Sequence, residues 1–267
     1  MQDRATAAQD IARSAGGLAL DYFHRMPSLT VEAKGPQDFV TEADRSVETH
    51  IRARIEEAFP LDGILGEEHA PKPSETGVTW VIDPIDGTAN FISSIPQWCV
   101  VLAIVAEDQT QVGVIYDAVH DELFSAVRGQ GGTLNGKNLV CPADGSLTSG
   151  AVGVGFSNRT EAQATLAVIG ELTAAGGRFF RNASGALSLA YVSAGRLQGY
   201  VEQHMHPWDC MAGQLLIAEA GGQVEAQSAD AMLAKGGRVI AGGASVFADL
   251  RRIADESFGP LEVRASH

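Results

Sequence analysis

Apolar residues recur at helical spacing in two segments near the start of the chain. The first predicts an amphipathic helix over residues 3–25, whose buried face repeats every three or four positions: Ala7, Ile11, Ala15, Leu18 and Tyr22. A second helix is predicted to begin after Thr41, because Thr41 and Asp44 have the spacing of a capping box with Asp in place of Glu. It is expected to end near Phe59 and Pro60.

Alternating apolar residues predict strands in the middle of the chain. Val78, Trp80 and Ile82 alternate as far as Asp83, and the missing N–H donor of Pro84 is expected to end that strand. Three later apolar runs, joined by short polar turns, predict an antiparallel meander: Trp98–Ala106, Gln111–Tyr116 and Glu122–Val127.

The second half of the chain alternates between strand and helix patterns. Strands are expected around Val152 and at 178–181 and 199–202, and helices over 161–175, 185–194 and 210–220. Turn-rich sequence over 129–136 and 141–150 separates this half from the meander. We therefore predict an α/β protein of two domains, with an α+β domain over residues 1–145 and an α/β domain over residues 146–267.

Composition and charge narrow the functional classes. The 267 residues include 33 acidic and 19 basic side chains, which gives a net charge of −14, and no Lys/Arg cluster reverses it locally. This balance predicts that neither nucleic acid nor a membrane surface is a partner. No apolar run approaches the ~18 residues of a membrane span, and the start of the chain lacks a signal-peptide core. We therefore expect a cytoplasmic protein.

The most informative segment begins at the predicted strand end. The segment Asp83–Asp86 has the sequence Asp-Pro-Ile-Asp, so its two carboxylates are three positions apart. Because the proline between them has a fixed φ, this turn is suited to hold a cation. Gly87 lets the backbone approach a ligand closely, and Thr88 is expected to cap a helix whose free N–H groups point at an anion. Asp-Pro and Asp-Gly also occur in turns that have no chemical role.

Two further acidic sites favour the cation-binding interpretation. Glu67 and Glu68 follow a short apolar run and are expected at the end of another strand. Asp209 lies in the first turn of an apolar helix, where a carboxylate can also be an ordinary partner of the helix dipole. Together with Asp83 and Asp86, these residues predict a site where a metal and a phosphate meet.

The combination of these motifs resembles the inositol monophosphatase family of metal-dependent, lithium-sensitive sugar phosphatases. The matching segments follow in the family's order and spacing between Lys34 and Gly222: Gly66-Glu67-Glu68, Asp83–Phe91, Trp208-Asp209 and Glu219–Gly222. The resemblance implies a layered α-β-α-β-α sandwich that is usually homodimeric. It also implies a requirement for two to three Mg²⁺ ions.

The same resemblance implies the metal ligands. Glu67, Asp83 and the backbone carbonyl of Ile85 are expected to bind the first ion. Asp83, Asp86 and Asp209 are expected to bind the second, and Glu67 to contact a third, loosely held ion. Oxygen ligands of this kind are those that Mg²⁺ prefers, so the donor chemistry agrees with the resemblance.

Catalytic and phosphate-binding roles are implied in the same way. Asp44 and Thr88, with Glu67 beside them, are expected to position a water molecule that attacks phosphorus in line. The phosphate is expected to lie on the backbone N–H groups of Gly87 and Thr88. No covalent intermediate is expected.

Recognition of the leaving group is expected on the substrate side of the cleft. Glu202, seven residues before Asp209, corresponds to a family carboxylate that binds an inositol hydroxyl, and Asp86 and Asp209 are expected to add contacts. Ser184 and Gly185 begin the substrate-side helix, where the family's usual Gly-Ser/Thr-Ala-Ala is replaced by Ala-Ser-Gly-Ala. The resemblance therefore implies a small phosphorylated polyol or sugar as substrate, with inositol 1-phosphate first.

Several alternatives to this function stay open. Histidinol phosphate, fructose 1,6-bisphosphate and an adenosine bisphosphate are alternative substrates for the same chemistry. A non-enzymatic regulatory or binding module with the same fold is an alternative of a different class. A Ca²⁺-binding loop is excluded, because the spacing of Asp83 and Asp86 is not that of an alternating Asp/Asn loop.

Overall fold

The computed structural model describes residues 1–26, 31–35, 38–156 and 160–259. Its helices are α1 (Gln2–Phe23), α2 (Glu42–Ala58), α3 (Thr88–Ile92), α4 (Ala162–Ala174), α5 (Gly185–Ser193), α6 (Pro207–Glu219), α7 (Ala229–Lys235) and α8 (Phe247–Phe258). Its strands are β1 (Val31–Gly35), β2 (Asp38–Thr41), β3 (Gly63–Gly66), β4 (Thr79–Asp86), β5 (Cys99–Ala106), β6 (Gln109–Asp117), β7 (Glu122–Val127), β8 (Gly132–Leu134), β9 (Lys137–Asn138), β10 (Ala151–Val154), β11 (Arg178–Phe180), β12 (Gly199–Met205), β13 (Gln223–Val224) and β14 (Gly237–Gly242).

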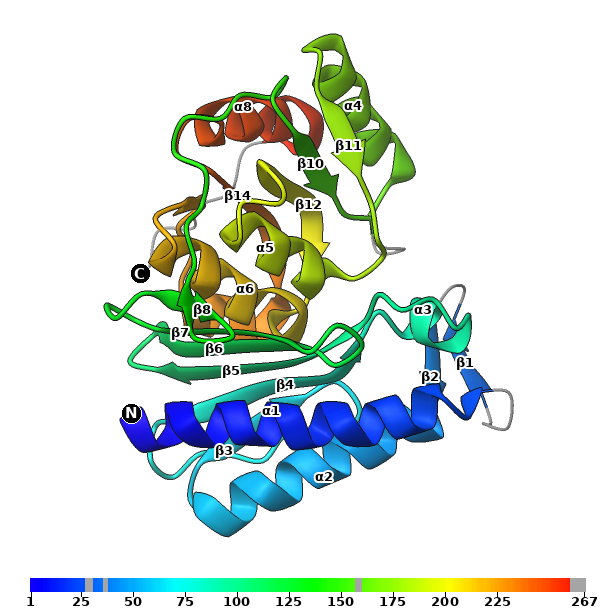
Figure 1. Cartoon of the computed structure of the whole chain (residues 1–267), viewed down its shortest axis with the longest axis vertical. Helices are drawn as coiled ribbons and strands as arrows, with labels where there is room; N and C mark the ends of the chain where they lie inside the picture. Colours follow the sequence, from blue (N-terminus) through cyan, green and yellow to red (C-terminus); the bar gives the residue numbers. More distant parts are fainter. Residues whose placement is uncertain (27–30, 36–37, 157–159, 260–267) are drawn as a thin grey trace.

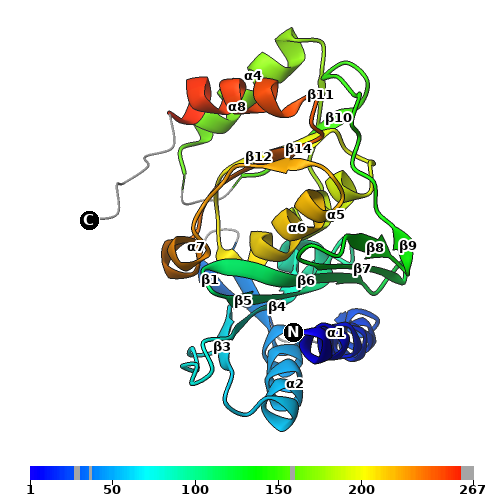
Figure 2. The same ribbon diagram turned by 90° about the vertical axis from the view of Figure 1, so that its left-hand side faces the viewer.

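These elements form five layers, which Figure 1 shows stacked from bottom to top. The long helices α1 and α2 lie beneath a seven-stranded sheet, and α5 and α6 lie above that sheet. A five-stranded sheet follows, and α4 and α8 cover its outer face. The view at right angles in Figure 2 shows the same order, with α5 and α6 enclosed between the two sheets. The predicted α-β-α-β-α sandwich of the α/β class is therefore confirmed.

The first layer forms largely as the sequence predicts. The predicted capping box begins α2: the Thr41 hydroxyl accepts from the Asp44 backbone N–H, and the Asp44 carboxylate accepts from the Thr41 backbone N–H. In α1 the fully buried stripe lies on Ala5, Ala8, Ile11, Ala12, Ala15 and Ala19, so it shares Ile11 and Ala15 with the predicted face, whereas the rest of that face is only partly buried. Small alanines let α1 approach the sheet closely, so the larger Leu18 and Tyr22 are left at the edge of this contact and only partly buried.

The seven-stranded sheet contains the predicted meander. Its strand order is β3-β4-β5-β6-β7-β8-β9, with β3 and β4 parallel and the following pairs antiparallel. Strand β4 does not end at Asp83 as expected but continues to Asp86. The register against β5 shifts between Asp83 and Asp86, so the bulge accommodates Pro84 without ending the strand.

The five-stranded sheet has the order β11-β10-β12-β14-β13. One apolar core joins both sheets through α5 and α6, because it includes Val81 of β4, Leu189 of α5, Leu216 of α6 and Val239 of β14. Helix α6 begins at Pro207, three residues earlier than expected, because proline is favourable in the first turn. The division into domains 1–145 and 146–267 stays a prediction.

None of the helices in the described part of the chain combines the length and the apolar character that a bilayer-spanning segment needs.

Candidate metal and phosphate site

Three carboxylates meet where the two halves of the chain come together. Asp83 and Asp86 come from the bulged end of β4, and Asp209 comes from the first turn of α6. One oxygen of each lies within 4.8 Å of the others. Asp83 is only 1% exposed and Asp86 only 8%. The structure therefore brings together three of the predicted metal ligands from segments more than a hundred residues apart.

The bulge gives these carboxylates fixed positions. The Ile85 backbone N–H donates to Asp83 Oδ1 at 2.9 Å, which holds the Asp83 side chain back against its own turn. Gly87 follows with φ of 99°, and a Cβ at this position would lie 2.9 Å from the carbonyl oxygen of Gln97. A glycine is therefore required here both by backbone conformation and by close approach.

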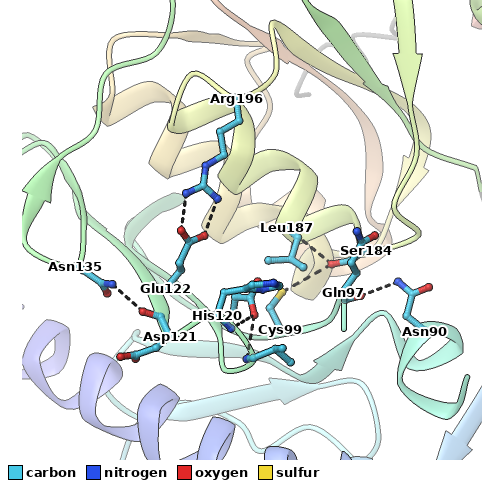
Figure 3. A network of polar contacts seen from close by, with 12 residues as sticks. Asn90, Gln97, Cys99, His120, Asp121, Glu122, Asn135, Ser184, Leu187 and Arg196 are labelled. Atoms are coloured by element: carbon cyan, nitrogen blue, oxygen red, sulfur yellow. Dashed lines mark hydrogen bonds and ion pairs between the residues drawn. The ribbon is translucent and has the colours of Figure 1, made fainter. Parts of the chain in front are cut away.

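Asp86 connects the two halves of the chain. Its Oδ2 accepts from the Ser184 hydroxyl at 2.5 Å and from the Ala186 backbone N–H at 2.8 Å, both at the N-terminus of α5. Figure 3 shows Ser184 between the Cys99 thiol and the backbone of Leu187. The Leu187 N–H donates to the Ser184 hydroxyl at 3.3 Å. The α5 dipole and these donors stabilise the Asp86 carboxylate. Burial nevertheless raises the pKa of Asp86.

The charge balance at this site is unfavourable without a cation. Burial raises the pKa of Asp83 well above its usual range, and the neighbouring charges of Glu67, Asp86 and Asp209 raise it further. Among the described residues, no lysine or arginine forms an ion pair with Asp83 or Asp86. A divalent cation would neutralise these carboxylates, and an all-oxygen donor set suits Mg²⁺. The residues present therefore fit the implied metal.

Asp44 and Thr88 lie in contact beside this group. The Thr88 hydroxyl is 3.3 Å from Asp44 Oδ1 and 3.2 Å from the carbonyl oxygen of Ile85, and it can donate to either. Thr41 fixes Asp44 from the other side, with its backbone N–H and its hydroxyl donating to Oδ2 at 2.8 and 2.7 Å. Burial raises the pKa of Asp44 to about 6 although the Thr41 hydrogen bonds act to lower it.

Thr88 does not cap the following helix as the sequence predicts. Gly87 is the N-cap of α3 and Thr88 is its first residue, so the Thr88 side chain is directed to Asp44 and Ile85. Gly87 can take this position because the chain turns there with positive φ. The Thr88 hydroxyl is therefore available for the site and does not serve the helix.

Glu67 follows β3 as predicted but lies outside the group of three carboxylates. Its side chain is half-buried, and its charge contributes to the raised pKa of Asp83. The structure thus places Glu67 close enough to act on Asp83 electrostatically. Its expected roles toward the metal and the water stay predictions.

A cavity of about 160 Å³ adjoins the carboxylates on the side of α5 and β12. It is lined by five of the predicted site residues: Asp86, Ser184, Gly185, Glu202 and Asp209. The Tyr200 hydroxyl donates to Glu202 Oε2 at 2.6 Å, which fixes the Glu202 carboxylate at the wall of the cavity. The cavity thus places an oriented carboxylate within reach of a molecule bound next to Asp86 and Asp209.

Sequence reasoning missed several residues of this cavity. Tyr200 could have been found, because it is two positions from Glu202 on a predicted strand and therefore on the same face. Arg181 and Asn182 also line the cavity, and they lie on the turn that leads into α5. Ala183 on this turn has φ of 60°, a left-handed conformation that an L-residue rarely adopts. Side-chain and backbone directions on such a turn do not follow from a sequence pattern.

Comparisons with known proteins agree with this geometry. The model of the inositol monophosphatase family matches residues 1–256. A relative in Salmonella typhimurium named Nus factor SuhB is 37% identical over 245 residues, which is 91% of this chain and 92% of the relative. Extragenic suppressor protein suhB from Bartonella henselae has a TM-score of 0.88 at 31% identity and covers 94% of this chain and 98% of its own. An inositol monophosphatase from Anabaena (Nostoc) has a TM-score of 0.82 at 32% identity and covers 96% of both chains.

These names correct one expectation. Net charge and the absence of a Lys/Arg cluster in the sequence predicted that nucleic acid is not a partner, but several relatives of this chain carry the name Nus factor, which denotes a role in transcription. The expectation is therefore wrong as a general exclusion. Neither observation excludes association through a protein partner, and basic side chains far apart in the sequence can still meet on a folded surface.

Proposed function

We propose, from the premise that this chain belongs to the inositol monophosphatase family, that it is a Mg²⁺-dependent phosphomonoesterase that hydrolyses inositol 1-phosphate. One observation carries the proposal: Asp83, Asp86 and Asp209 meet beside the Asp44–Thr88 pair, and Asp86 and Asp209 line a cavity whose wall also carries Glu202. This arrangement combines a place for cations, a place for a water molecule and a place for a polyol.

Two sets of ligands would hold the metal. Glu67, Asp83 and the Ile85 carbonyl would hold one ion, and Asp83 would share a second with Asp86 and Asp209. Glu67 would also contact a third. When bound, Mg²⁺ supplies charge neutralisation for the phosphate and for the attacking and leaving oxygens. The carboxylates fix its position, because Asp83 is held by the Ile85 N–H and Asp86 by the N-terminus of α5.

Thr88 and Asp44 would position the attacking water. When the Thr88 hydroxyl donates to Asp44 or to the Ile85 carbonyl, its oxygen lone pairs are left to accept a hydrogen bond from water. The Asp44 carboxylate, fixed by Thr41, would accept a second hydrogen bond from this water and take up its proton as the new phosphorus–oxygen bond forms. The bond from phosphorus to the polyol oxygen would break at the same time, and this oxygen would take a proton from solvent. The N–H groups of Gly87 and Thr88 would hold the phosphate in line with this water.

The cavity supports a hydroxyl-bearing leaving group. Glu202, oriented by Tyr200, can accept a hydrogen bond from a polyol hydroxyl. Ser184 and Gly185 at the start of α5 form the adjoining wall, and Met205 fills the place of the missing side chain, because a Cβ built on Gly185 would lie 2.5 Å from the Met205 Cε. Histidinol phosphate and other sugar phosphates are alternative substrates for the same site. A homodimer stays a prediction.

Phosphate release from a panel of substrates tests this function. Inositol 1-phosphate, histidinol phosphate, fructose 1,6-bisphosphate and adenosine 3′,5′-bisphosphate would each be assayed with Mg²⁺ and with EDTA. We expect Mg²⁺-dependent release with the highest kcat/KM for inositol 1-phosphate. A higher kcat/KM for another substrate would reject inositol 1-phosphate as the preferred substrate. No phosphate release from any of the four by folded protein would reject the phosphatase reaction.

The names of the relatives favour a second candidate function, a role in transcription of the kind that a Nus factor has. Binding of the purified chain to a purified transcription elongation complex would test it. The variant Asp83→Asn separates the two functions, because binding that survives this change does not depend on turnover. Absence of binding by wild-type protein would reject the second function and leave the first untouched.

A further inference from the structure

Glu48 is a fully buried carboxylate that the proposed chemistry does not use. It is 0% exposed and lies on α2, one helical turn after Asp44. A buried charge is strongly unfavourable unless it is paired and hydrogen-bonded, so its contacts show what it does. Residues four positions apart lie on the same face of a helix, and Glu48 therefore extends the face that carries Asp44 toward the end of β3.

The contacts of Glu48 converge on the loop that carries Glu67. Oε2 accepts from the Glu68 backbone N–H at 2.7 Å, and Oε1 accepts from the His69 backbone N–H at 3.2 Å. The residue before Glu67 also adjoins this carboxylate, because a Cβ built on Gly66 would lie 2.4 Å from Glu48 Oε1. Glu48 therefore fixes the backbone after Glu67 by two hydrogen bonds and packs against the residue before it.

Arg52 completes this arrangement from the next turn of α2. Its Nε donates to Glu48 Oε1 at 2.7 Å, and one of its terminal nitrogens donates to the His69 carbonyl oxygen at 3.2 Å. The His69 ring nitrogen Nδ1 also lies 3.2 Å from Glu48 Oε1. The loop is thus held through its N–H groups by Glu48 and through a carbonyl by Arg52.

We infer that Glu48 is a positioning residue for the metal site, which sets the direction of Glu67 by bonding the backbone of Glu68 and His69 and by packing against Gly66. This inference rests on the proposed function, because it takes Glu67 as a metal ligand. Partners of metal ligands commonly change metal affinity when they are removed. Helix α2 then positions two parts of the site at once, with Asp44 toward the water and Glu48 toward the Glu67 loop.

This place of Glu48 also explains why the Gly-Glu-Glu motif begins with a residue that has no side chain. Gly66 has no positive φ, so its backbone conformation does not require glycine. The space that its missing Cβ leaves is occupied by the Glu48 carboxylate. The variant Gly66→Ala should therefore displace Glu48 and reproduce the effect of removing it.

The experiment compares wild type with Glu48→Gln by two measurements that need no turnover. The first is amide hydrogen exchange of residues 66–69 in metal-free protein, and the second is calorimetric titration with Mg²⁺. We expect exchange at Glu68 and His69 to become about tenfold faster or more, because an amide side chain cannot accept both N–H groups and Arg52. We expect the Kd for Mg²⁺ to rise about tenfold or more.

Asp62→Asn is the control for a purely structural effect. Asp62 is also buried and also paired with an arginine, Arg4, but it lies away from the metal site. This variant should lower stability without changing the Kd for Mg²⁺. If Glu48→Gln does not fold, Gly66→Ala is measured in its place, with the same two readouts and the same expectations.

Three outcomes would overturn the inference. Unchanged exchange at Glu68 and His69 would show that Glu48 does not fix the loop. Faster exchange with a Kd for Mg²⁺ within twofold of wild type would show that the loop does not position a metal ligand. Wild-type protein that binds no Mg²⁺ would overturn the proposed function and this inference together, whereas the first two results would overturn the inference alone.

Discussion

Asp62 and Asp83 are two equally buried aspartates with opposite electrostatics. Each is 1% exposed. Two nitrogens of Arg4 donate to the Asp62 carboxylate at 2.7 and 2.8 Å, and the Thr76 hydroxyl and the Trp80 indole N–H add two more hydrogen bonds. Although burial acts to raise the pKa of Asp62, these partners lower it below the usual range. Asp62 is thus a fully paired structural carboxylate.

Asp83 has none of these partners. It accepts one described hydrogen bond, from the Ile85 N–H, and burial together with three neighbouring carboxylates raises its pKa. Trp80, which donates to Asp62, and Asp83 belong to the same strand, so one strand contributes to both environments. At Asp62 the fold supplies the cation, which is the Arg4 guanidinium. At Asp83 it does not, and we propose that the cation there comes from solution.

Replacing Asp83 should give the largest effect on function. Asp83→Asn keeps the size of the side chain but removes the charge that would bridge two ions, so kcat/KM should fall by about 10⁴-fold or more. Phosphate release in saturating Mg²⁺ measures this change, and circular dichroism confirms the fold. Retained activity would remove Asp83 from the proposed metal site.

Replacing Asp62 should affect stability and not turnover. Asp62→Asn leaves Arg4 without its carboxylate partner, and the free energy of unfolding should fall by about 2–4 kcal/mol. Urea denaturation measures the loss, and kcat/KM for the preferred substrate should stay within twofold of wild type. A large fall in kcat/KM would show that the two aspartates are not functionally distinct.

Replacing Thr88 tests the proposed positioning of the attacking water. Thr88→Ala removes the hydroxyl that contacts Asp44, so kcat should fall about 10²-fold while KM changes little. Steady-state kinetics separate the two parameters. A raised KM with unchanged kcat would instead assign Thr88 to substrate binding.

The pH dependence of stability should give the smallest effect. Carboxyls with raised pKa in the folded state, such as Asp83 and Asp44 with its pKa of about 6, hold protons more tightly when folded than when unfolded. These carboxyls should therefore lower the unfolding free energy of metal-free protein by roughly 1–3 kcal/mol as the pH rises from about 4 to about 7, whereas Asp62, with its lowered pKa, acts in the opposite sense. Denaturation across this range measures the slope.

Asp83→Asn should reduce this slope and raise the metal-free stability near pH 7, because it removes a carboxylate that has no cation. Saturating Mg²⁺ should abolish the loss in wild type, since bound metal replaces the protons. Equal slopes in wild type and Asp83→Asn, both without metal, would contradict a raised pKa of Asp83 in the folded protein.

The sequence predicted what depends on short-range pattern. The capping box at Thr41 and Asp44, the meander and the first-turn position of Asp209 follow from local spacing, and the structure confirms them. The continuation of β4 through Pro84 could not be predicted, because it depends on a bulge in the pairing with β5. The same applies to Thr88, whose side-chain direction is set by Asp44 on another element.

Contacts between residues far apart in the sequence make up most of what the sequence did not predict. Nothing in the local pattern shows that Asp86 accepts from Ser184, 98 residues later, or that Glu48 contacts the Glu67 loop. The resemblance to a family supplied the candidate ligands but not these supporting contacts. The expected exclusion of nucleic acid failed for a related reason, because total charge and the absence of a Lys/Arg cluster in the sequence show neither the folded surface nor a protein partner.

Calorimetric titration of Mg²⁺ into wild type and Asp83→Asn, without substrate, measures whether Asp83 takes its cation from solution. Wild-type protein should bind Mg²⁺ and release protons at pH 6, because carboxyls with raised pKa values must lose protons to bind metal. Asp83→Asn should show no comparable binding, while Asp62→Asn should bind as wild type does. Equal binding by wild type and Asp83→Asn, or no binding by wild type, would contradict the claim that this carboxylate group takes its cation from solution.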